Sequence, residues 1–538
     1  MNNSNDMEHN GLRHPRARKP MMLSGDSPFG DLRSSKSTSS TPVLSGINTP
    51  EPPEDAPPSV KATSAVRHHV RQQRRLFPTV EYFSRVSYFD PRSDYSNFRG
   101  FFVLFWIGLA IMVITAMLRS LKDTGYLLSF KQWPLFVENI GELVMADLAM
   151  CASLMLDLPL HLLYKRSNGI LRWNRCGMLV QSAFQAAWLS LWISWPFLRG
   201  WTWTAQVFLI LHTLALFMKL HSYAFYNGHL STTLNRLQEL DRPIGPKTVM
   251  DDAVRYPQIS RPQSSAGENQ EQDKRPPVAQ LRTALAEELT SPLGRVTYPQ
   301  NLTVTNFVDF LFCPTLCYEL EYPRTPSRSY LEIFYKGLAV LGCVFLIIVT
   351  SEEFILPVLE SSSIRLQQTH SFSDRALVFA ETVSALLFPF MVTFLLVFLV
   401  IFEYILGFFA EITRFADRHF YSDWWNSGDW LEFSREWNIP VHNFFRRHVY
   451  SMSRNSNLSK STATAVTFFI SALGHELIMG CITRKFRGYG FVLMMMQIPF
   501  VAIQRLPLVK KRRLLNNIIF WISMIVGLSL LCALYVLV

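Results

Sequence analysis

The chain has 538 residues, of which 49% are hydrophobic and only 17% are charged. Soluble domains carry about 25% charged residues, so this composition argues against an ordinary soluble enzyme. The formal net charge of +11 fits basic flanks beside an anionic membrane surface, or a phosphate-bearing substrate, at least as well as nucleic acid. The seven cysteines lack the spacing of a zinc site, so we expect no metal and no disulfide framework.

Residues 1–97 are expected to form a disordered, basic cytosolic tail that ends in a pre-membrane segment. Ser, Pro and charged residues dominate its runs at 34–42 and 49–57, which leaves little apolar surface to bury. The basic run at 67–75 comes shortly before the first apolar segment. The positive-inside rule therefore places the N-terminus in the cytosol.

From residue 98 to 538 the sequence predicts an all-α polytopic membrane domain with about nine spans. A helix needs ~20 apolar residues to cross the hydrocarbon core. The candidates are Phe101–Leu118, Ile140–Leu163, Cys176–Leu198, Trp203–Phe225, Leu331–Leu356, Val378–Phe409, Ala463–Cys481, the short Phe491–Ile503 and Leu514–Val538. Of the polar segments between them, 229–300 is expected to be a flexible cytosolic insertion, whereas 411–462 is unusually rich in aromatic and charged residues.

His475 is the sharpest candidate for catalysis, because it lies near the middle of the seventh apolar segment. Ionisable groups inside a membrane are costly and are often functional. An imidazole can take the proton of a hydroxyl, and Ser471, one helical turn earlier, could orient the ring or bind substrate. The alternative is a structural histidine, since His161, His212 and His221 also lie in apolar segments and cannot all be catalytic.

A second constellation lies in the aromatic segment, where Phe-Tyr-Ser-Asp-Trp-Trp-Asn occupies 420–426 and Trp-Asn-Ile-Pro-Val-His occupies 437–442. Aromatic rings beside cations suit either an interfacial belt or a cleft for a flat, phosphate-bearing molecule. The amide of Asn438 could donate to a carbonyl or a developing oxyanion, a role that a belt would not require.

Taken together, these motifs resemble the membrane-bound O-acyltransferases, in particular their fungal sterol O-acyltransferase branch. The resemblance runs from about Phe98 to Val538 and includes 218–228, 312–318, 322–325 and 410–418. It implies nine transmembrane helices and acyl transfer from acyl-CoA, as a substrate rather than a cofactor, to the 3β-hydroxyl of a sterol. It also implies an endoplasmic reticulum membrane location and a homo-oligomer, either a dimer or a dimer of dimers.

The same resemblance assigns roles to residues. It implies that His475 is the catalytic base and Asn438 its companion. An acyl-CoA site would include Phe420, Tyr421, Asp423, Trp424, Trp425, Asn426, Arg435, Trp437, His442, Tyr450, Lys460 and Ser471. Of these, Lys460 or Arg435 could pair with the phosphates of CoA.

Two other functions remain open from the sequence. A diacylglycerol acyltransferase would use the same acyl donor and the same histidine, although 218–228 favours a sterol enzyme. A polytopic transporter would be expected to show broken spans in related halves, and the sequence shows none.

Overall fold

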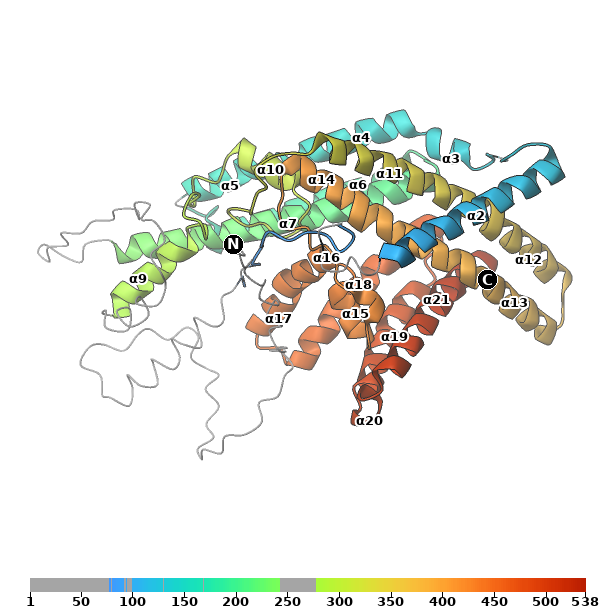
Figure 1. Ribbon diagram of the computed structural model, residues 1–538. Helices are drawn as coiled ribbons and strands as arrows, with labels where there is room; N and C mark the ends of the chain where they lie inside the picture. Colours follow the sequence, from blue (N-terminus) through green and yellow to red (C-terminus); the bar gives the residue numbers. More distant parts are fainter. Residues whose placement is uncertain are drawn as a thin grey trace, which may run out of the picture. The chain divides into compact units, whose positions relative to one another are not determined.

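The computed structural model describes residues 77–538 apart from 79, 91–92, 94–98, 129, 168 and 242–276, so most of the expected tail lies outside the described residues. The described part is helical and has isolated β-bridges in place of strands (Figure 1). Its α-helices are α2 (Arg99–Thr124), α3 (Trp133–Val137), α4 (Ile140–Leu154), α5 (Asp157–Arg166), α6 (Met178–Leu198), α7 (Trp203–Leu240), α9 (Pro277–Glu288), α10 (Val304–Phe312), α11 (Tyr330–Thr350), α12 (Leu356–Gln368), α13 (Phe372–Phe398), α14 (Leu406–Thr413), α15 (Trp430–Glu436), α16 (Ile439–Phe444), α17 (Ser451–Asn455), α18 (Lys460–Thr483), α19 (Tyr489–Gln504), α20 (Pro507–Lys510) and α21 (Arg513–Leu537).

Shorter helical turns join several of these helices. Four are π-helical: Trp173–Gly177, Ser351–Ile355, Leu399–Ile405 and Phe445–Tyr450. Trp424–Asn426 is a 3₁₀ turn. Because these turns continue the helices beside them, α11 and α12 run as one stretch, and so do α13 and α14.

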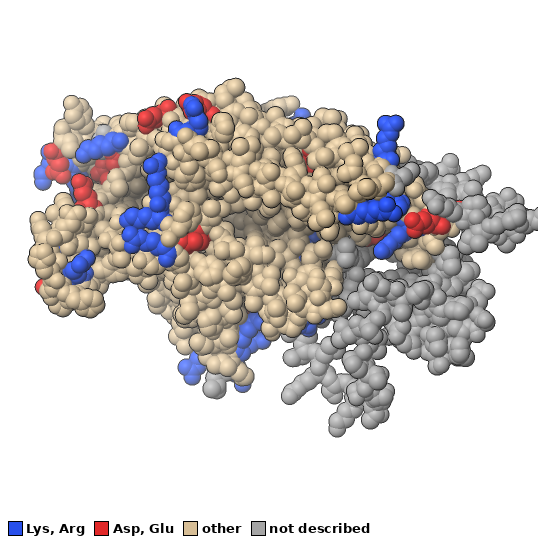
Figure 2. All heavy atoms as spheres, turned by 180° about the vertical axis from the view of Figure 1, so that it is seen from behind, with Lys and Arg blue, Asp and Glu red and all other residues tan. Residues whose placement is uncertain are grey.

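Eight helical stretches in the described part of the chain are long and apolar enough to cross a membrane. They are Gly100–Thr124, Trp133–Arg166, Trp173–Leu198, Trp203–Leu240, Tyr330–Gln368, Phe372–Thr413, Lys460–Thr483 and Arg513–Leu537. Charged side chains are sparse over the middle of the face in Figure 2, as a bilayer requires. The predicted all-α polytopic fold is therefore confirmed. The ninth expected span forms α19, whose 16 residues measure roughly 24 Å, and its crossing stays a prediction.

Helix α7 is much longer than the apolar run that predicted it. At 38 residues it measures roughly 57 Å, so it extends well beyond a ~30 Å hydrocarbon core. Its last third belongs to the expected insertion, 229–300, and α9 belongs to the same segment. The middle of that segment, 242–276, lies outside the described residues. The described ends of the expected insertion are thus helical.

The part of α7 that continues beyond Phe225 packs against a buried ion pair between Arg447 and Glu319. Their closest atoms are 3.0 Å apart, and the Arg447 side chain is only 1% exposed. Arg447 also donates to the Tyr318 carbonyl oxygen at 2.9 Å and lies 4.5 Å from the ring centre of Tyr226 on α7. Burial raises the pKa of Glu319, and the positive charge of Arg447 opposes that rise. The pair joins three segments that are distant in sequence.

The pre-membrane segment, residues 80–90, packs along the same polar region. The Val80 amide donates to Glu319 at 3.0 Å, and Tyr82 shares a hydrogen bond of 2.6 Å with Thr315. Arg85 forms a two-point ion pair with the buried carboxylate of Asp417. These contacts tie the chain that precedes α2 to the loops from which the candidate site is built.

We expect Arg447→Met to destabilise the protein strongly, because it leaves the Glu319 carboxylate buried without its partner. Such a loss costs about 3–5 kcal/mol. The matched control is Arg446→Met, the same change at the adjacent, exposed position. The measurement is the midpoint of thermal unfolding in detergent, and adding Glu319→Leu to Arg447→Met should recover much of the lost stability. Equal midpoints for the two single variants would contradict this role.

Candidate active site

His475 lies on α18 and makes one hydrogen bond in the described part of the chain, between its Nδ1 and the Ser471 carbonyl oxygen at 2.8 Å. A carbonyl oxygen only accepts, so Nδ1 carries the hydrogen. In the neutral ring, Nε2 is then the nitrogen with a free lone pair. The ring is exposed at the surface of the helix, where a substrate hydroxyl could reach it. The helix itself thus fixes the tautomer that a general base needs.

Asn438 begins α16 as its N-cap. Its Oδ1 accepts from the Val441 amide at 3.1 Å, and Pro440 stands in the first turn of the helix. Because the cap uses Oδ1, the Nδ2 group points its two hydrogens elsewhere, and it has no hydrogen-bond partner among the described residues. The cap orients a donor amide, although no hydrogen bond joins Asn438 to His475 in the described part of the chain.

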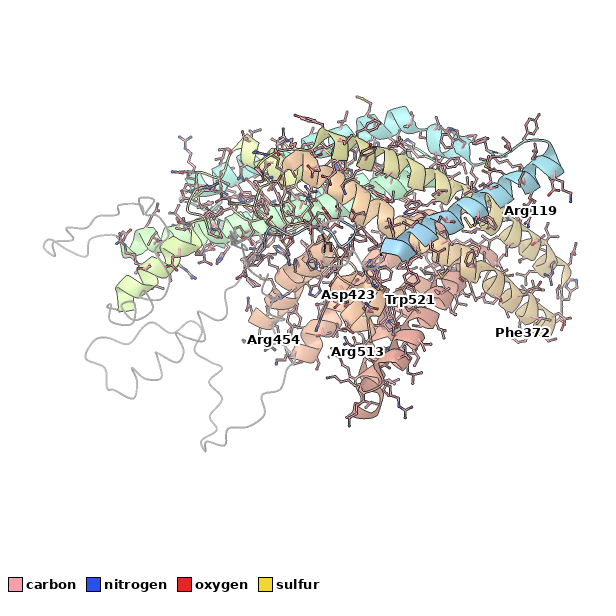
Figure 3. All side chains as sticks on the ribbon, viewed as in Figure 1. Arg119, Phe372, Asp423, Arg454, Arg513 and Trp521 are labelled. Carbon is pink, nitrogen blue, oxygen red and sulfur yellow. The ribbon has the colours of Figure 1, made fainter. Side chains whose placement is uncertain are left out.

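The segment Phe420–Asn426 is anchored by its aromatic side chains. Phe420, Tyr421 and Trp424 are at most 3% exposed. Tyr421 donates to Glu403 at 3.1 Å, and the backbone carbonyl of Trp425 accepts from Trp521 on α21 at 3.1 Å. Figure 3 labels Trp521 and, in this segment, Asp423. Further ring contacts join Trp424 to Phe394, Phe398, Phe433, Trp437 and Trp521. Asp423 and Trp425 are half-buried and Asn426 is exposed, so the accessible part of the segment is held on an aromatic base.

A group of cationic side chains lies next to this segment. Burial lowers the pKa of Arg435, and the positive charges of Arg505 and Arg446 lower it further. Burial also lowers the pKa of His442 to about 4, again with Arg435 and Arg446 contributing. His442 is therefore neutral at pH 7, while the arginines keep their charges. Neither Arg435 nor Arg446 forms an ion pair with a described residue, which leaves positive charge available for an anionic ligand.

The remaining candidates are spread along the chain between this group and His475. Tyr450 ends the π-helical turn Phe445–Tyr450, Lys460 is exposed in the first turn of α18, and Ser471 is the partner of His475. The turn Phe445–Tyr450 packs against α18, so the polypeptide around Tyr450 is next to the helix of the histidine.

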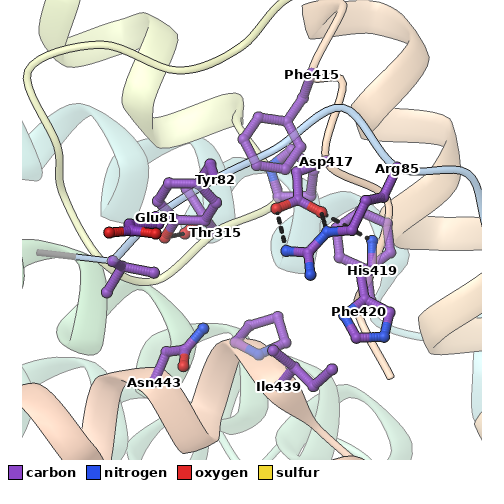
Figure 4. Close-up of a pocket in the computed structure, with 13 residues that line it drawn as sticks. Glu81, Tyr82, Arg85, Thr315, Phe415, Asp417, His419, Phe420, Ile439 and Asn443 are labelled. Carbon is purple, nitrogen blue, oxygen red and sulfur yellow. Dashed lines mark hydrogen bonds and ion pairs between the residues drawn. The ribbon is translucent and has the colours of Figure 1, made fainter. Parts of the chain in front are cut away.

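A small pocket separates the pre-membrane segment from the start of α16. It holds about 30 Å³, which is roughly the space of one water molecule, and is therefore too small for a substrate. Arg85, Asp417 and His419 line one side, and Ile439 and Asn443 line the other (Figure 4). It marks the contact between residues 80–90 and the helix that Asn438 caps.

Three potential metal ligands meet between α4 and α7, among the described residues. Atoms of Asp147, Cys151 and His212 lie within 4.8 Å of one another. However, His212 Nδ1 and Asp147 Oδ1 already form a hydrogen bond of 2.6 Å. We interpret this group as a polar contact between two helices, because the hydrogen bond uses atoms that an ion would need.

Comparison with known proteins adds to this geometry. The model of the membrane-bound O-acyltransferase family matches residues 184–537, which include every candidate site residue. The chain belongs to that family. This acyltransferase is 40% identical to the probable sterol O-acyltransferase 2 of Schizosaccharomyces pombe over 86% of this chain and 91% of that protein. It is 32% identical to sterol O-acyltransferase 2 of Saccharomyces cerevisiae over 82% of this chain and 66% of that protein. Diacylglycerol O-acyltransferase 1 of Dictyostelium discoideum is 34% identical over 45% of this chain and 38% of that protein.

Sequence reasoning singled out the motif at 218–228 but missed the contacts that it makes in this acyltransferase. His448, two residues before Tyr450, is buried, and its Nε2 is 2.9 Å from the Ser222 hydroxyl on α7. Its ring lies 5.2 Å from that of His221. Gly228 is also constrained, because an added Cβ would lie 2.0 Å from the Trp173 ring. The motif at 218–228 contains one side of each contact, but it gives no sign of the partners, His448 and Trp173.

Glu436 gives a pH-dependent prediction. Burial, together with the negative charges of Glu432 and Asp423, raises the pKa of this half-buried carboxyl to about 7. In the unfolded chain it ionises near its ordinary value, so between about pH 4.5 and 7 the folded state binds more protons. Stability contributed by this group therefore falls as pH rises through that window.

We expect Glu436→Gln to raise the thermal midpoint relative to the native protein at pH 8 and to change it little at pH 5. After solvent screening, the difference should be about 1 kcal/mol. Glu81→Gln, the same change at an exposed position, is the control. A pH-independent effect of Glu436→Gln would contradict the raised pKa.

Proposed function

We propose that this acyltransferase transfers a long-chain acyl group from acyl-CoA to the 3β-hydroxyl of a sterol, which gives a steryl ester and CoA. One observation carries the mechanism: His475 Nδ1 is bonded to the Ser471 carbonyl oxygen of its own apolar helix, which leaves the lone pair of the neutral ring on Nε2. The match to sterol O-acyltransferases over most of the chain supports a sterol as the acceptor. We further propose that the enzyme is a homo-oligomer of the endoplasmic reticulum membrane with its N-terminus in the cytosol.

The reaction requires two proton transfers, one from the sterol hydroxyl and one to the CoA sulfur. His475 Nε2 takes the hydroxyl proton of the sterol while the oxygen attacks the thioester carbonyl carbon. The carbon–sulfur bond then breaks, and the imidazolium returns the proton to the departing CoA sulfur. Asn438 Nδ2 donates to the carbonyl oxygen as negative charge develops there. No metal is needed, because the thioester is already an activated acyl donor.

The polar end of acyl-CoA is assigned to the aromatic and cationic segment. Asp423, Trp425 and Asn426 form the accessible part of the site, and the buried Phe420, Tyr421 and Trp424 hold it in place. Lys460 and Arg435 attract the phosphates. Trp437, His442, Tyr450 and Ser471 line the path towards His475. The acyl chain and the sterol remain in the apolar region, where little water competes for the thioester.

The alternative acceptor is diacylglycerol, which the name of the Dictyostelium relative brings into consideration. Microsomes that contain the protein, given labelled oleoyl-CoA, should form labelled steryl ester from ergosterol or cholesterol. Exclusive formation of triacylglycerol would replace the sterol assignment but leave the acyl-transfer mechanism in place.

His475→Asn is the sharpest test of the base. Asparagine can keep an N–H near the position of Nδ1, and with it the contact to the Ser471 carbonyl, but it has no equivalent of Nε2. We expect steryl ester synthesis to fall by a factor of about 10² to 10⁴ while the protein stays folded and inserted. His212→Asn is a control for loss of an intramembrane histidine. Near-normal synthesis by His475→Asn would refute the assignment.

Arg435→Gln tests the phosphate contact. We expect KM for oleoyl-CoA to rise about tenfold with little change in kcat, because the lost contact lies far from the reacting atoms. The same variant should behave like the native enzyme towards an oleoyl-pantetheine thioester, which lacks the nucleotide phosphates. An equal loss with both acyl donors would show that Arg435 acts through folding rather than through phosphate.

A further inference from the structure

A basic cleft lies where two of the spans end, and none of its lining residues is a candidate for the active site. It has a volume of about 410 Å³ and is lined by Val308, Asp309, Phe312, Arg324, Arg328, Ile412, Thr413 and Arg414. None of these residues belongs to the site proposed for acyl transfer. The lining residues belong to α10, to the end of α14 and to the chain that leads into α11. Figure 1 labels these three helices.

Three arginines and one carboxylate give the cleft a net charge of +2. Arg324 is committed to the protein, because it pairs with Asp309 and donates to the Thr413 carbonyl oxygen at 2.7 Å. Arg328 and Arg414 are exposed and have no ion pair or hydrogen bond from their side chains to a described residue. Two guanidinium groups are therefore available to a ligand with negative charge.

The position of these two arginines relates the cleft to the bilayer surface. Arg414 directly follows Thr413, where the span Phe372–Thr413 ends, and Arg328 precedes Tyr330, where the span Tyr330–Gln368 begins. The two spans pack together through α11 and α14. Arg414 is also fixed in the left-handed region at φ 58°, and its carbonyl accepts from the Thr325 amide at 2.7 Å. The backbone at this charged corner is thus held firmly.

The cleft has an apolar lining formed by Val308, Phe312 and Ile412, and exposed apolar side chains of α11 follow Arg328 in the chain. Phe312 is 53% exposed, and its ring lies 6.4 Å from that of Phe409 on α14. Tyr330, Leu331 and Phe334 at the start of α11 are more than 60% exposed. A ligand with a charged head and an apolar tail would meet guanidinium groups and apolar surface at the same time.

We propose that this cleft binds the phosphate-bearing head group of an anionic phospholipid from the surrounding leaflet, with Arg328 and Arg414 as its main contacts. Basic side chains at the membrane surface attract anionic lipids, and guanidinium groups match phosphate oxygens in geometry. A free phosphate would satisfy the arginines but would leave the apolar side of the cleft unused. The lipid is therefore the occupant that the whole lining fits.

The test measures lipid binding to the purified full-length protein in a neutral detergent by native mass spectrometry. The probes are dioctanoyl phosphatidylserine, dioctanoyl phosphatidylcholine and glycerol 3-phosphate. We expect the serine lipid to bind the native protein best. Arg328→Gln with Arg414→Gln should weaken that binding about tenfold or more, and replacement of both by Lys should restore part of it.

The matched control is Arg119→Gln with Arg375→Gln, which removes the same charge from two exposed arginines elsewhere on the spans. Figure 3 labels Arg119 and also Phe372, the first residue of α13, three residues before Arg375. Thermal midpoints and steryl ester synthesis in lipid-free detergent should be unchanged in both double variants. Three outcomes would overturn the proposal: unchanged lipid binding after loss of Arg328 and Arg414, an equal loss in the control pair, or binding of phosphatidylcholine or glycerol 3-phosphate as tight as that of the serine lipid.

Discussion

The buried ion pair between Arg447 and Glu319 is the contact on which the polar half of this molecule depends. It joins the turn Phe445–Tyr450, which follows α16, to the loop before α11, and Arg447 also lies over an aromatic ring of α7. Two charges withdrawn from water are stabilised only when their geometry is good and their remaining hydrogens find partners. Here Arg447 Nη1 also donates to the Tyr318 carbonyl oxygen, and Glu319 accepts from the Val80 amide. Arg447 Nε and Nη2 have no hydrogen-bond partner in the described part of the chain, and the guanidinium lies over the Tyr226 ring instead. The pair therefore sets the position of the chain that carries His442, Arg446 and Tyr450.

The arrangement of charge follows from the two environments that the proposed substrates occupy. A CoA nucleotide carries phosphates and stays in water, whereas an acyl chain and a sterol partition into hydrocarbon. The cationic residues Arg435 and Arg446 lie in the polar segment, and His475 lies in an apolar helix. A thioester that enters from the polar side and a hydroxyl that enters from the membrane would meet between the polar segment and the helix of His475. Separation of the two binding regions is thus a consequence of substrate chemistry.

The sequence predicted the helical membrane fold and its family because both leave local signals. Apolar runs mark the spans, and the motifs around 420–426 and 475 are contiguous in the chain. The continuation of α7 beyond Phe225 could also have been found, since Leu230, Leu234 and Leu237 follow a helical spacing. The contacts of Arg447 and of residues 80–90 could not, because their partners are hundreds of residues away or lie on other elements. Pairing of this kind depends on tertiary structure and has no periodicity.

The site also shows why the type of residue alone does not decide catalysis. His212 is an intramembrane histidine as well, but its Nδ1 is bonded to the Asp147 carboxylate across two helices. His475 instead donates to a carbonyl of its own helix, one turn earlier. That bond needs no partner on another helix, and in the neutral ring it leaves the lone pair on Nε2. In an apolar medium an added carboxylate would bring its own desolvation cost. A backbone carbonyl of the same helix can therefore orient a neutral base without a second buried charge. This partner distinguishes His475 from His212, whose partner is a carboxylate on another helix.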